Sequence, residues 1–219
     1  MPGLGTIINT LAIVAGGLLG LLFKNFLNER LETLLIKTLF IGTGGTLSQM
    51  LRVTQSGALE TTGTMMLIVC FVLGSAVGEL LDLEGKFEGF GVWLRRKTHN
   101  ESDTGFLSAF INASLTVCIG AMAIVGAIED ALAGDISLLC AKAALDAVFV
   151  LVMTASMGKG CIFSAIPVAV LQGAVTILAR LIAPVLTDAA IANLSYTGSV
   201  MIFCVGLNLV WGKTIKVAN

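Results

Sequence analysis

Residues 4–23 have the sequence LGTIINTLAIVAGGLLGLLF, which contains no charged side chain. A helix that crosses a lipid bilayer needs about 20 mostly apolar residues, so this stretch is long enough to span a membrane. No basic residue precedes it, and the apolar sequence continues past Gly16 and Gly17, which argues against a cleaved signal peptide. We therefore interpret residues 4–23 as a permanent transmembrane helix.

The composition of the whole chain agrees with this interpretation. Of its 219 residues, 56% are apolar and 12% are charged, and the mean hydropathy is +0.96. A soluble domain carries roughly a quarter charged residues, because charged groups cover much of its surface. The composition therefore excludes a disordered chain, a secreted disulfide scaffold and a nucleic-acid-binding protein, and we expect no nucleic acid among the partners.

Apolar stretches of spanning length recur along the chain. They lie at residues 4–23, 31–51, 63–83, 106–128, 136–157, 160–183 and 195–212. Seven helices would use about 140 residues and leave short connections between them. The sequence thus predicts an all-α polytopic membrane protein with about seven transmembrane helices, which form a single membrane domain over residues 1–219.

The basic residues are distributed unevenly between the two sides of the predicted membrane domain. Only Arg52 and Arg180 fall on the side that carries the N-terminus. Cytoplasmic loops of membrane proteins are rich in Lys and Arg, so we expect the N-terminus outside and the C-terminal tail in the cytoplasm. The basic residues on the cytoplasmic side are Lys24, Arg30, Lys86, Arg95, Arg96, Lys97, Lys159, Lys213 and Lys216.

The longest connection, residues 84–105, has an amphipathic pattern. Its apolar positions recur at helical spacing and are followed by the basic run at 95–97. This pattern is typical of a helix that lies in the cytoplasmic headgroup layer, where basic residues bind anionic lipid. We expect membrane lipid as its partner, and the linker separates the two halves of the chain. The apolar positions are Phe87, Phe90 and Leu94, together with Leu83 just before the linker.

Short patterns recur in the two halves of the chain. Helices one and four cross the membrane in opposite directions, so the matches predict an inverted repeat of three plus three helices, a plan common in secondary transporters. The repeats would occupy residues 1–83 and 106–183, with residues 195–212 as an extra helix. The matched positions are Asn9 and Gly17 with Asn112 and Gly120, and Lys37 with Lys142.

Three charged residues, Lys37, Lys142 and Asp146, lie well inside predicted helices, and Lys142 is on the outer side, against the bias of the basic loops. A charge near the centre of a membrane helix costs about 2.5 to 3.5 kcal/mol, so each one needs a partner or a function. Lys37 can extend its side chain to the cytoplasmic headgroups. Lys142 and Asp146 are four residues apart on one helical face and can pair. The pair fits either an ion pair that fixes helix packing or a substrate or proton site.

Neutral polar residues inside the predicted helices form a second set of candidates. Amide and hydroxyl oxygens at membrane depth can bind a small cation or a polar solute, although hydrogen bonding between helices is their commoner role. Asn9 and Asn112 stand out because they occupy matching places in the proposed repeat, close to glycines that permit an interrupted helix. The candidate substrate or ion ligands are Asn9, Asn112, Ser114, Lys142, Asp146, Gln172 and Asn208.

Two further features concern access and packing. Glu129 and Asp130 form an acidic outer loop that would concentrate cations at an entrance. Small residues spaced along two helices favour close helix approach or self-association, which makes a homo-oligomer a candidate state. The packing glycines are Gly16, Gly17 and Gly20 in the first helix, and Gly74 and Gly78 in the third.

The sequence offers no set of residues for catalysis. The single histidine, His99, lies in the polar linker, and the five cysteines lack metal-ligand spacing. No nucleotide-binding glycine pattern or zinc signature is present. We therefore expect no enzyme activity, no catalytic residue, no metal site and no cofactor.

Several blocks of sequence resemble a known family. They include GLGTIINTLAIVAGGLLG at 3–20, VLGSAVGELLDLEG at 72–85, ASLTVCIGAMAIVGAIEDAL at 113–132, KAALDA at 142–147, VLQGA at 170–174 and VGLNL at 205–209. The chain resembles the YdfK/YqgA-like family of bacterial inner-membrane proteins, domain of unknown function 554. The resemblance implies an inner-membrane location without an activity, and a further apolar helix after the segment that matches KVAN. It places Asn9, Glu79, Glu129, Asp130, Lys142, Asp146, Gln172 and Asn208 among the family features.

The leading functional hypothesis is a secondary transporter for a small polar solute or a monovalent cation. Its site would lie near the membrane midplane between the repeats, with Asn9 and Asn112 contacting the solute or coupling cation. Lys142 and Asp146 would carry charge or a proton between access states. The alternatives are an oligomeric ion channel, which would use the glycine-rich faces for assembly, and a non-transporting membrane assembly or sensor protein.

Overall fold

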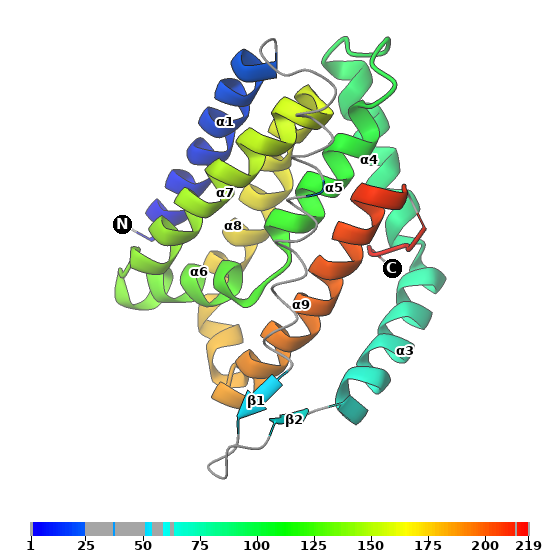
Figure 1. Cartoon of the computed structure of the whole chain (residues 1–219). Helices are drawn as coiled ribbons and strands as arrows, with labels where there is room; N and C mark the ends of the chain where they lie inside the picture. The colour runs from blue at the N-terminus through cyan, green and yellow to red at the C-terminus, as the bar shows by residue number, and fades with distance from the viewer. Residues whose placement is uncertain are drawn as a thin grey trace.

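In the computed structural model, helices α1 (Leu4–Lys24) and α7 (Ser137–Met157) pack side by side along their lengths and run in the same direction (Figure 1). Small residues on α1 allow the two backbones to approach closely. The structure describes residues 2–24, 37, 51–53, 59–61, 64–212 and 214–218. The contacts that set the direction are Gly5 with Leu139, Gly16 with Ala147, and Gly20 with Leu151.

The remaining described helices pack against this pair and against one another, and α1 stands at one edge of the bundle (Figure 1). Helices α5, α6 and α8 contact the pair, whereas α3 stands at another edge, next to α9 (Figure 1). Before α3, the chain forms a short antiparallel ribbon of β1 (Leu51–Val53) and β2 (Leu59–Thr61), which the sequence does not predict. The helices are α3 (Thr64–Leu81), α4 (Leu83–Lys97), α5 (Phe106–Cys118), α6 (Ala121–Ala133), α8 (Ala165–Ile182) and α9 (Asp188–Trp211), with short 3₁₀ segments η2 (Lys159–Ser164) and η3 (Ala183–Val185).

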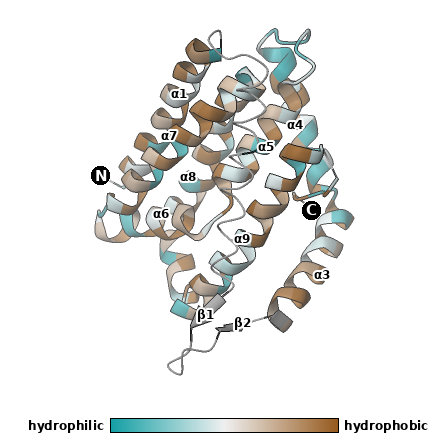
Figure 2. Cartoon of the chain, viewed as in Figure 1, coloured by the Kyte–Doolittle hydropathy of each residue, from teal (hydrophilic) through white to brown (hydrophobic). Residues whose placement is uncertain are grey.

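Many large apolar residues of these helices are exposed, and Figure 2 shows that hydrophobic residues occur along most of the helices. Leu80 on α3 is 84% exposed, Ile177 on α8 is 83% exposed, and Met65 on α3 is 78% exposed. A soluble monomer rarely exposes contiguous apolar surface on this scale, whereas a lipid bilayer covers it. The described part of the protein therefore has the surface of a helical membrane protein.

The structure supports four to six membrane spans in its described part. Helices α1, α7 and α9 and the segment Lys159–Val185 are each long and apolar enough to cross a membrane. Two bent helix pairs, α3 with α4 and α5 with α6, add up to two more spans. The helical membrane fold is therefore confirmed. The predicted helix at 31–51 lies outside the described residues except for Lys37, which is helical, and Leu51, which begins β1.

The predicted span at 106–128 is one of the two bent helix pairs, since the structure divides it into α5 and α6. The two helices are bent by 59° relative to each other. Ile119 has extended backbone angles, and Gly120 has a φ of 135° that L side chains rarely adopt. The glycine therefore permits a break that a hydrophobicity pattern cannot reveal.

A second bend separates α3 from α4, the helix of the predicted linker. Asp82 adopts a left-handed conformation with a φ of 47°, and its side chain accepts a hydrogen bond from the Gly85 backbone N–H. The helices on either side are bent by 51°. The predicted third helix, 63–83, thus ends at Leu81, and the linker helix starts with an N-terminal cap.

The apolar side of α4 packs on α5. The Phe87 ring stacks on the Phe110 ring at 5.3 Å between centroids, and Leu94 is buried against Phe106 and Phe110. The face that we expect to meet lipid is therefore largely covered by protein, while Trp93 remains 55% exposed.

Candidate functional site

Helix α7 carries an ion pair that is buried inside the helix bundle. Lys142 and Asp146 lie four residues apart on one face of the helix, where the sequence predicts pairing. The ammonium nitrogen of Lys142, Nζ, lies 2.8 Å from Asp146 Oδ1 and 2.7 Å from Oδ2. Each residue is only 7% exposed. Lys142 and Asp146 are called the buried ion pair below.

The buried ion pair lies at the break between α5 and α6. Lys142 Nζ donates a further hydrogen bond to the backbone carbonyl oxygen of Val117, at 2.9 Å. Val117 is in the last turn of α5, where carbonyl groups lose their partners within the helix. The partial negative charge of a helix C-terminus favours a cation at this point. Lys142 therefore caps the broken helix while it neutralises Asp146.

Asn9 of α1 lies beside the buried ion pair. Its side chain is fully buried, and its amide faces the carboxylate of Asp146. Neither the amide nitrogen nor the amide oxygen makes a hydrogen bond of standard geometry. Leaving a buried amide without a partner is costly, so this position suits a water molecule, a cation or a polar solute.

Other buried polar side chains also lack hydrogen-bond partners. Among them are Thr6 from α1, Ser114 from α5 and Gln172 from α8. Ser114 and Gln172 are 0% exposed. By contrast, the hydroxyl groups of Thr10, Thr116 and Thr176 donate to carbonyls one turn earlier in their own helices.

Contacts between α1 and α8 show which part of α1 lies beside Gln172. Gly3, just before α1, lies against Thr176, and Ile13 shares a buried cluster with Val168. The two helices therefore run in opposite directions, and Gln172 lies beside the first half of α1. This is the half of α1 that also carries Asn9 and Thr6. The bundle thus holds unsatisfied polar groups close to the level of the buried ion pair.

The other predicted amides have partners of a different kind. The Asn112 amide donates to Ser108 Oγ, one turn earlier in α5, at 3.3 Å. The Asn208 amide holds the C-terminal tail: its oxygen accepts from the backbone N–H groups of Thr214 and Ile215, and its nitrogen donates to the Ile215 carbonyl. In the structure Asn208 therefore anchors the C-terminal tail.

Asp130 is buried rather than displayed at an acidic entrance. It is 1% exposed, and its Oδ2 atom accepts a hydrogen bond of 2.9 Å from the Gly5 backbone N–H. Gly5 is in the first turn of α1, where backbone N–H groups need outside acceptors and the helix dipole favours a negative charge. Glu129 is half-buried. Asp130 therefore caps α1, a correction to the predicted acidic entrance.

The predicted packing glycines behave differently on the two helices. A methyl group at Gly16 would meet the backbone of Ala147, and one at Gly20 would meet Leu151 and Thr154. Gly17 faces the side chain of Ile162. Gly74, in contrast, faces open space within the described part of the structure. Gly78 is buried.

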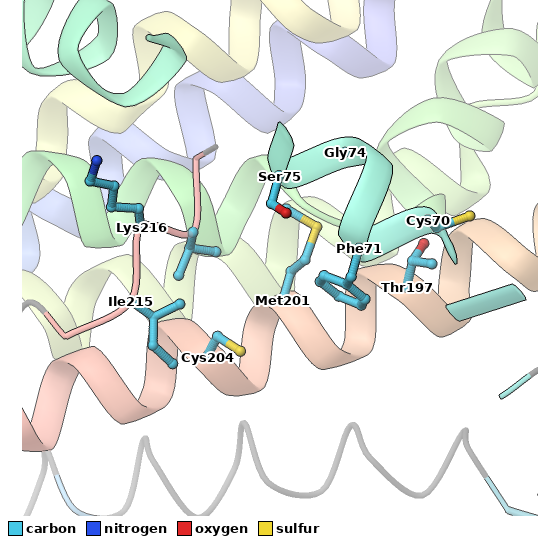
Figure 3. A pocket seen from close by; sticks show the side chains of 10 residues that line it. Cys70, Phe71, Gly74, Ser75, Thr197, Met201, Cys204, Ile215 and Lys216 are labelled. Atoms are coloured by element: carbon cyan, nitrogen blue, oxygen red, sulfur yellow. The ribbon is translucent and has the colours of Figure 1, made fainter. Parts of the chain in front are cut away.

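A cavity of about 390 Å³ separates α3 from α9 (Figure 3). Phe71 and Met201 project into the space between the two helices, and the C-terminal tail closes one side (Figure 3). The walls are mostly apolar, which does not suit a polar solute. The lining residues are Cys70, Phe71, Gly74, Ser75, Thr197, Met201, Cys204, Ile215, Lys216 and Val217.

Two parts of the site were not predicted from sequence. The Val117 carbonyl is a backbone group, so its role as an acceptor cannot be predicted from the residue type. Gly120, three residues later, is the signal in the sequence that indicates a helix break. The cap formed by Asp130 depends on a contact between residues 125 positions apart. Only the tertiary structure can bring such groups together.

Comparisons with known proteins agree with the membrane fold. A family model described as protein of unknown function (DUF554) matches residues 4–219. The chain belongs to the DUF554 family. The resemblance found in its sequence motifs is therefore confirmed. No solved structure matches the chain.

Two curated relatives of this DUF554 protein cover nearly its whole length. The uncharacterized membrane protein YdfK of Bacillus subtilis strain 168 is 25% identical over 98% of this chain and 90% of its own length. The uncharacterized protein YqgA of Escherichia coli K12 is 26% identical over 99% of this chain and 91% of its own length. Together with the exposed apolar helices, the first relative indicates a membrane location.

Proposed function

We propose that this DUF554 protein is a secondary transporter for a small polar solute or a monovalent cation. The observation that carries the proposal is the buried ion pair at the end of a broken helix, with Lys142 bonded to both Asp146 and the Val117 carbonyl. Secondary transporters commonly bind their coupling ions and substrates at discontinuous helices near the membrane midplane.

The chemistry around the break supports a polar binding site. Asn9 and Gln172 are fully buried and their side-chain amides make no hydrogen bond of standard geometry. A membrane helix that only needed stable packing would avoid such groups, because each buried polar group without a partner costs about 1 to 3 kcal/mol. A transported solute or its coupling cation would recover this cost while bound.

The arrangement of helices is compatible with the proposed inverted repeat. The end of α1 and the start of α5 both contact η2, since Gly17 faces Ile162 and Phe106 faces Gly160. The first half of α1 and the end of α5 both meet the buried ion pair. Helices α1 and α5 therefore run in opposite directions, as the proposed repeat requires. We further propose an inner-membrane location with the N-terminus outside.

In this proposal, binding of solute or cation rearranges the charges at the break and allows the site to open to the other side. Lys142 holds the Val117 carbonyl and Asp146 together in the structure described here. Releasing one of these contacts would free α5 and α6 to move relative to α7. Differential binding to two arrangements of this kind is what couples a ligand to a conformational change.

Flux measurements with purified protein in liposomes test the proposal. We expect saturable uptake of radiolabelled sodium, rubidium or members of a panel of labelled amino acids, driven by an imposed proton or sodium gradient. The matched control is the double variant Lys142→Met/Asp146→Leu, which removes both charges and should fold without transporting. Current steps of single-channel size in planar bilayers, or equal flux through the double variant, would contradict a carrier that uses this site.

A further inference from the structure

The ammonium group of Lys142 occupies a position that resembles a cation-binding site. Its nitrogen lies within 2.7 to 2.9 Å of three oxygen atoms, which belong to the Asp146 carboxylate and the Val117 carbonyl. Carboxylate oxygens and carbonyls at broken helices are also the ligands that transporters use for alkali cations. The Lys142 ammonium is thus surrounded by oxygen atoms of the kind that bind a free metal cation.

The oxygen set is larger than Lys142 needs. The fully buried Asn9 amide faces Asp146 and makes no hydrogen bond of standard geometry. Its oxygen could join the Asp146 carboxylate and the Val117 carbonyl around an ion that accepts more ligands than an ammonium group has protons. This fully buried amide, which makes no hydrogen bond of standard geometry, is a second observation that points to a ligand beside the ion pair.

Lys142 also has a route away from these oxygens. It lies in the second turn of α7, which begins at Ser137. At about 1.5 Å of rise per residue, its Cα is less than about 10 Å from the helix end, within the range over which a long lysine side chain can reach the interface. Exchange of one monovalent cation for the ammonium would leave the net charge of the buried cluster unchanged, whereas a divalent cation would add a buried charge.

We infer that a monovalent metal cation binds to Asp146, the Val117 carbonyl and Asn9 in exchange for the Lys142 ammonium, which acts as a tethered competitor. The role of this exchange in coupling rests on the proposed transport function, but cation binding itself does not. Lys142 then keeps the site filled and α5 fixed when no cation is bound. Removing the lysine should convert a site with weak apparent affinity into one with strong affinity.

Thermal unfolding of purified protein in detergent tests this inference. The Lys142→Met variant should unfold at a temperature about 5 °C or more higher in saturating sodium chloride than in N-methylglucamine chloride of the same concentration. The wild-type protein should show a much smaller difference, because its lysine competes. The matched control is Lys216→Met, which removes an exposed lysine that pairs with Glu79, and it should behave as the wild type does. Adding Asp146→Asn to Lys142→Met should abolish the sodium effect.

A second measurement uses the wild-type protein and does not depend on the folding of a variant. Sodium chloride should displace the Lys142 ammonium and increase its acetylation by acetic anhydride several-fold over tetramethylammonium chloride, whose quaternary nitrogen cannot react with the anhydride, as measured by mass spectrometry. Acetylation of Lys216, which is exposed, should be the same in both salts.

The inference is overturned if sodium, potassium and lithium all fail to stabilise folded Lys142→Met more than N-methylglucamine does. If Lys142→Met does not fold, the inference is overturned when sodium leaves the acetylation of Lys142 in the wild-type protein unchanged. Cation binding without flux through the wild-type protein would contradict the transport proposal and leave the cation site in place. Flux through the wild-type protein without any effect of cations on stability or acetylation would contradict the cation site and leave the transport proposal in place.

Discussion

The segments 9–17 and 112–120 begin with asparagine and end with glycine at the same interval, yet they have different structures. The first remains helical within α1, which continues to Lys24. The second stops being helical at Ile119, and Gly120 turns the chain into α6. The two segments therefore show that a shared sequence pattern does not fix a shared backbone.

The surroundings of the two glycines explain this difference. Gly17 is buried against Ile162, and Gly16 beside it packs against the backbone of α7. Gly120 faces open space, and its φ of 135° is accessible because it has no side chain. At the first segment, close packing with α7 stabilises a continuous helix. At the second, the Lys142 ammonium compensates the carbonyl end that the break exposes.

The largest effect should come from breaking the buried ion pair at the second segment. Asp146→Asn should cost about 3 to 5 kcal/mol in the free energy of unfolding, because it leaves the charge of Lys142 buried without a counter-charge. The double variant Lys142→Met/Asp146→Leu should recover most of this loss. Unfolding in detergent measures both values. A single variant as stable as the wild type would show that the pair does not hold the break.

Close packing at the first segment should give the next largest effect. Gly16→Ala places a methyl group against the backbone of Ala147, and we expect a loss of about 2 to 3 kcal/mol from overpacking. Gly74→Ala is the matched control, since a methyl group there meets open space and alanine favours helix. The unfolding temperature of Gly16→Ala should therefore fall below that of the wild type. The unfolding temperature of Gly74→Ala should rise or stay the same.

Substituting the two matched glycines compares the segments directly. Gly120→Ala should cost about 1 to 2 kcal/mol, because alanine disfavours a φ of 135°. Gly17→Ala should be destabilising through contact with the Ile162 side chain, so adding Ile162→Ala should restore stability to it. Ile162→Ala should not rescue Gly120→Ala. Rescue of both variants would mean that the two glycines have the same role.

The exposed ion pair between Lys216 and Glu79 should have the smallest effect and serves as the counterpart of the buried one. Lys216 Nζ lies 2.7 Å from Glu79 Oε1, and this hydrogen bond raises the pKa of Lys216 above its ordinary value of 10.5. A lysine whose pKa is raised by folding contributes stability below its unfolded pKa and loses it as the pH rises through the folded pKa.

Glu79→Gln should therefore lower the pKa of Lys216 and hardly change thermal unfolding, because exposed ion pairs contribute little. An NMR titration of isotope-labelled dimethyl-lysine would measure the pKa. Between pH 6 and 9, both proteins should keep a constant difference in unfolding temperature, since Lys216 remains charged throughout. A large loss of stability would show that this exposed pair is as important as the buried one.

Much of the helical membrane fold was predictable from the sequence. The predicted helix at 136–157 matches α7 at Ser137–Met157, and the predicted helix at 195–212 lies within α9 at Asp188–Trp211. These helices are long and apolar, and the length of a span depends mainly on local composition. The sequence predicts separate helices before and after residue 83, close to the observed break at Asp82, whereas the break after Cys118 lies within one predicted apolar stretch.

The candidate site was only partly predictable. The spacing of Lys142 and Asp146 on one helical face predicts their salt bridge, which the structure contains. The same kind of reasoning did not reveal that Asp130 would be buried against α1 or that Asn208 would hold the tail. Acidic and amide groups have many possible partners, and the choice depends on which helices become neighbours.

The sequence alone determined that lipid surrounds this protein, since 56% of its residues are apolar and only 12% are charged. It also placed two opposite charges one helical turn apart on α7, because that spacing is a local property of the helix. The tertiary structure decided which backbone carbonyl faces Lys142 and which amide faces Asp146. Those choices depend on how separate helices pack, and so do the strengths of buried polar contacts, because packing excludes the water that would otherwise satisfy them.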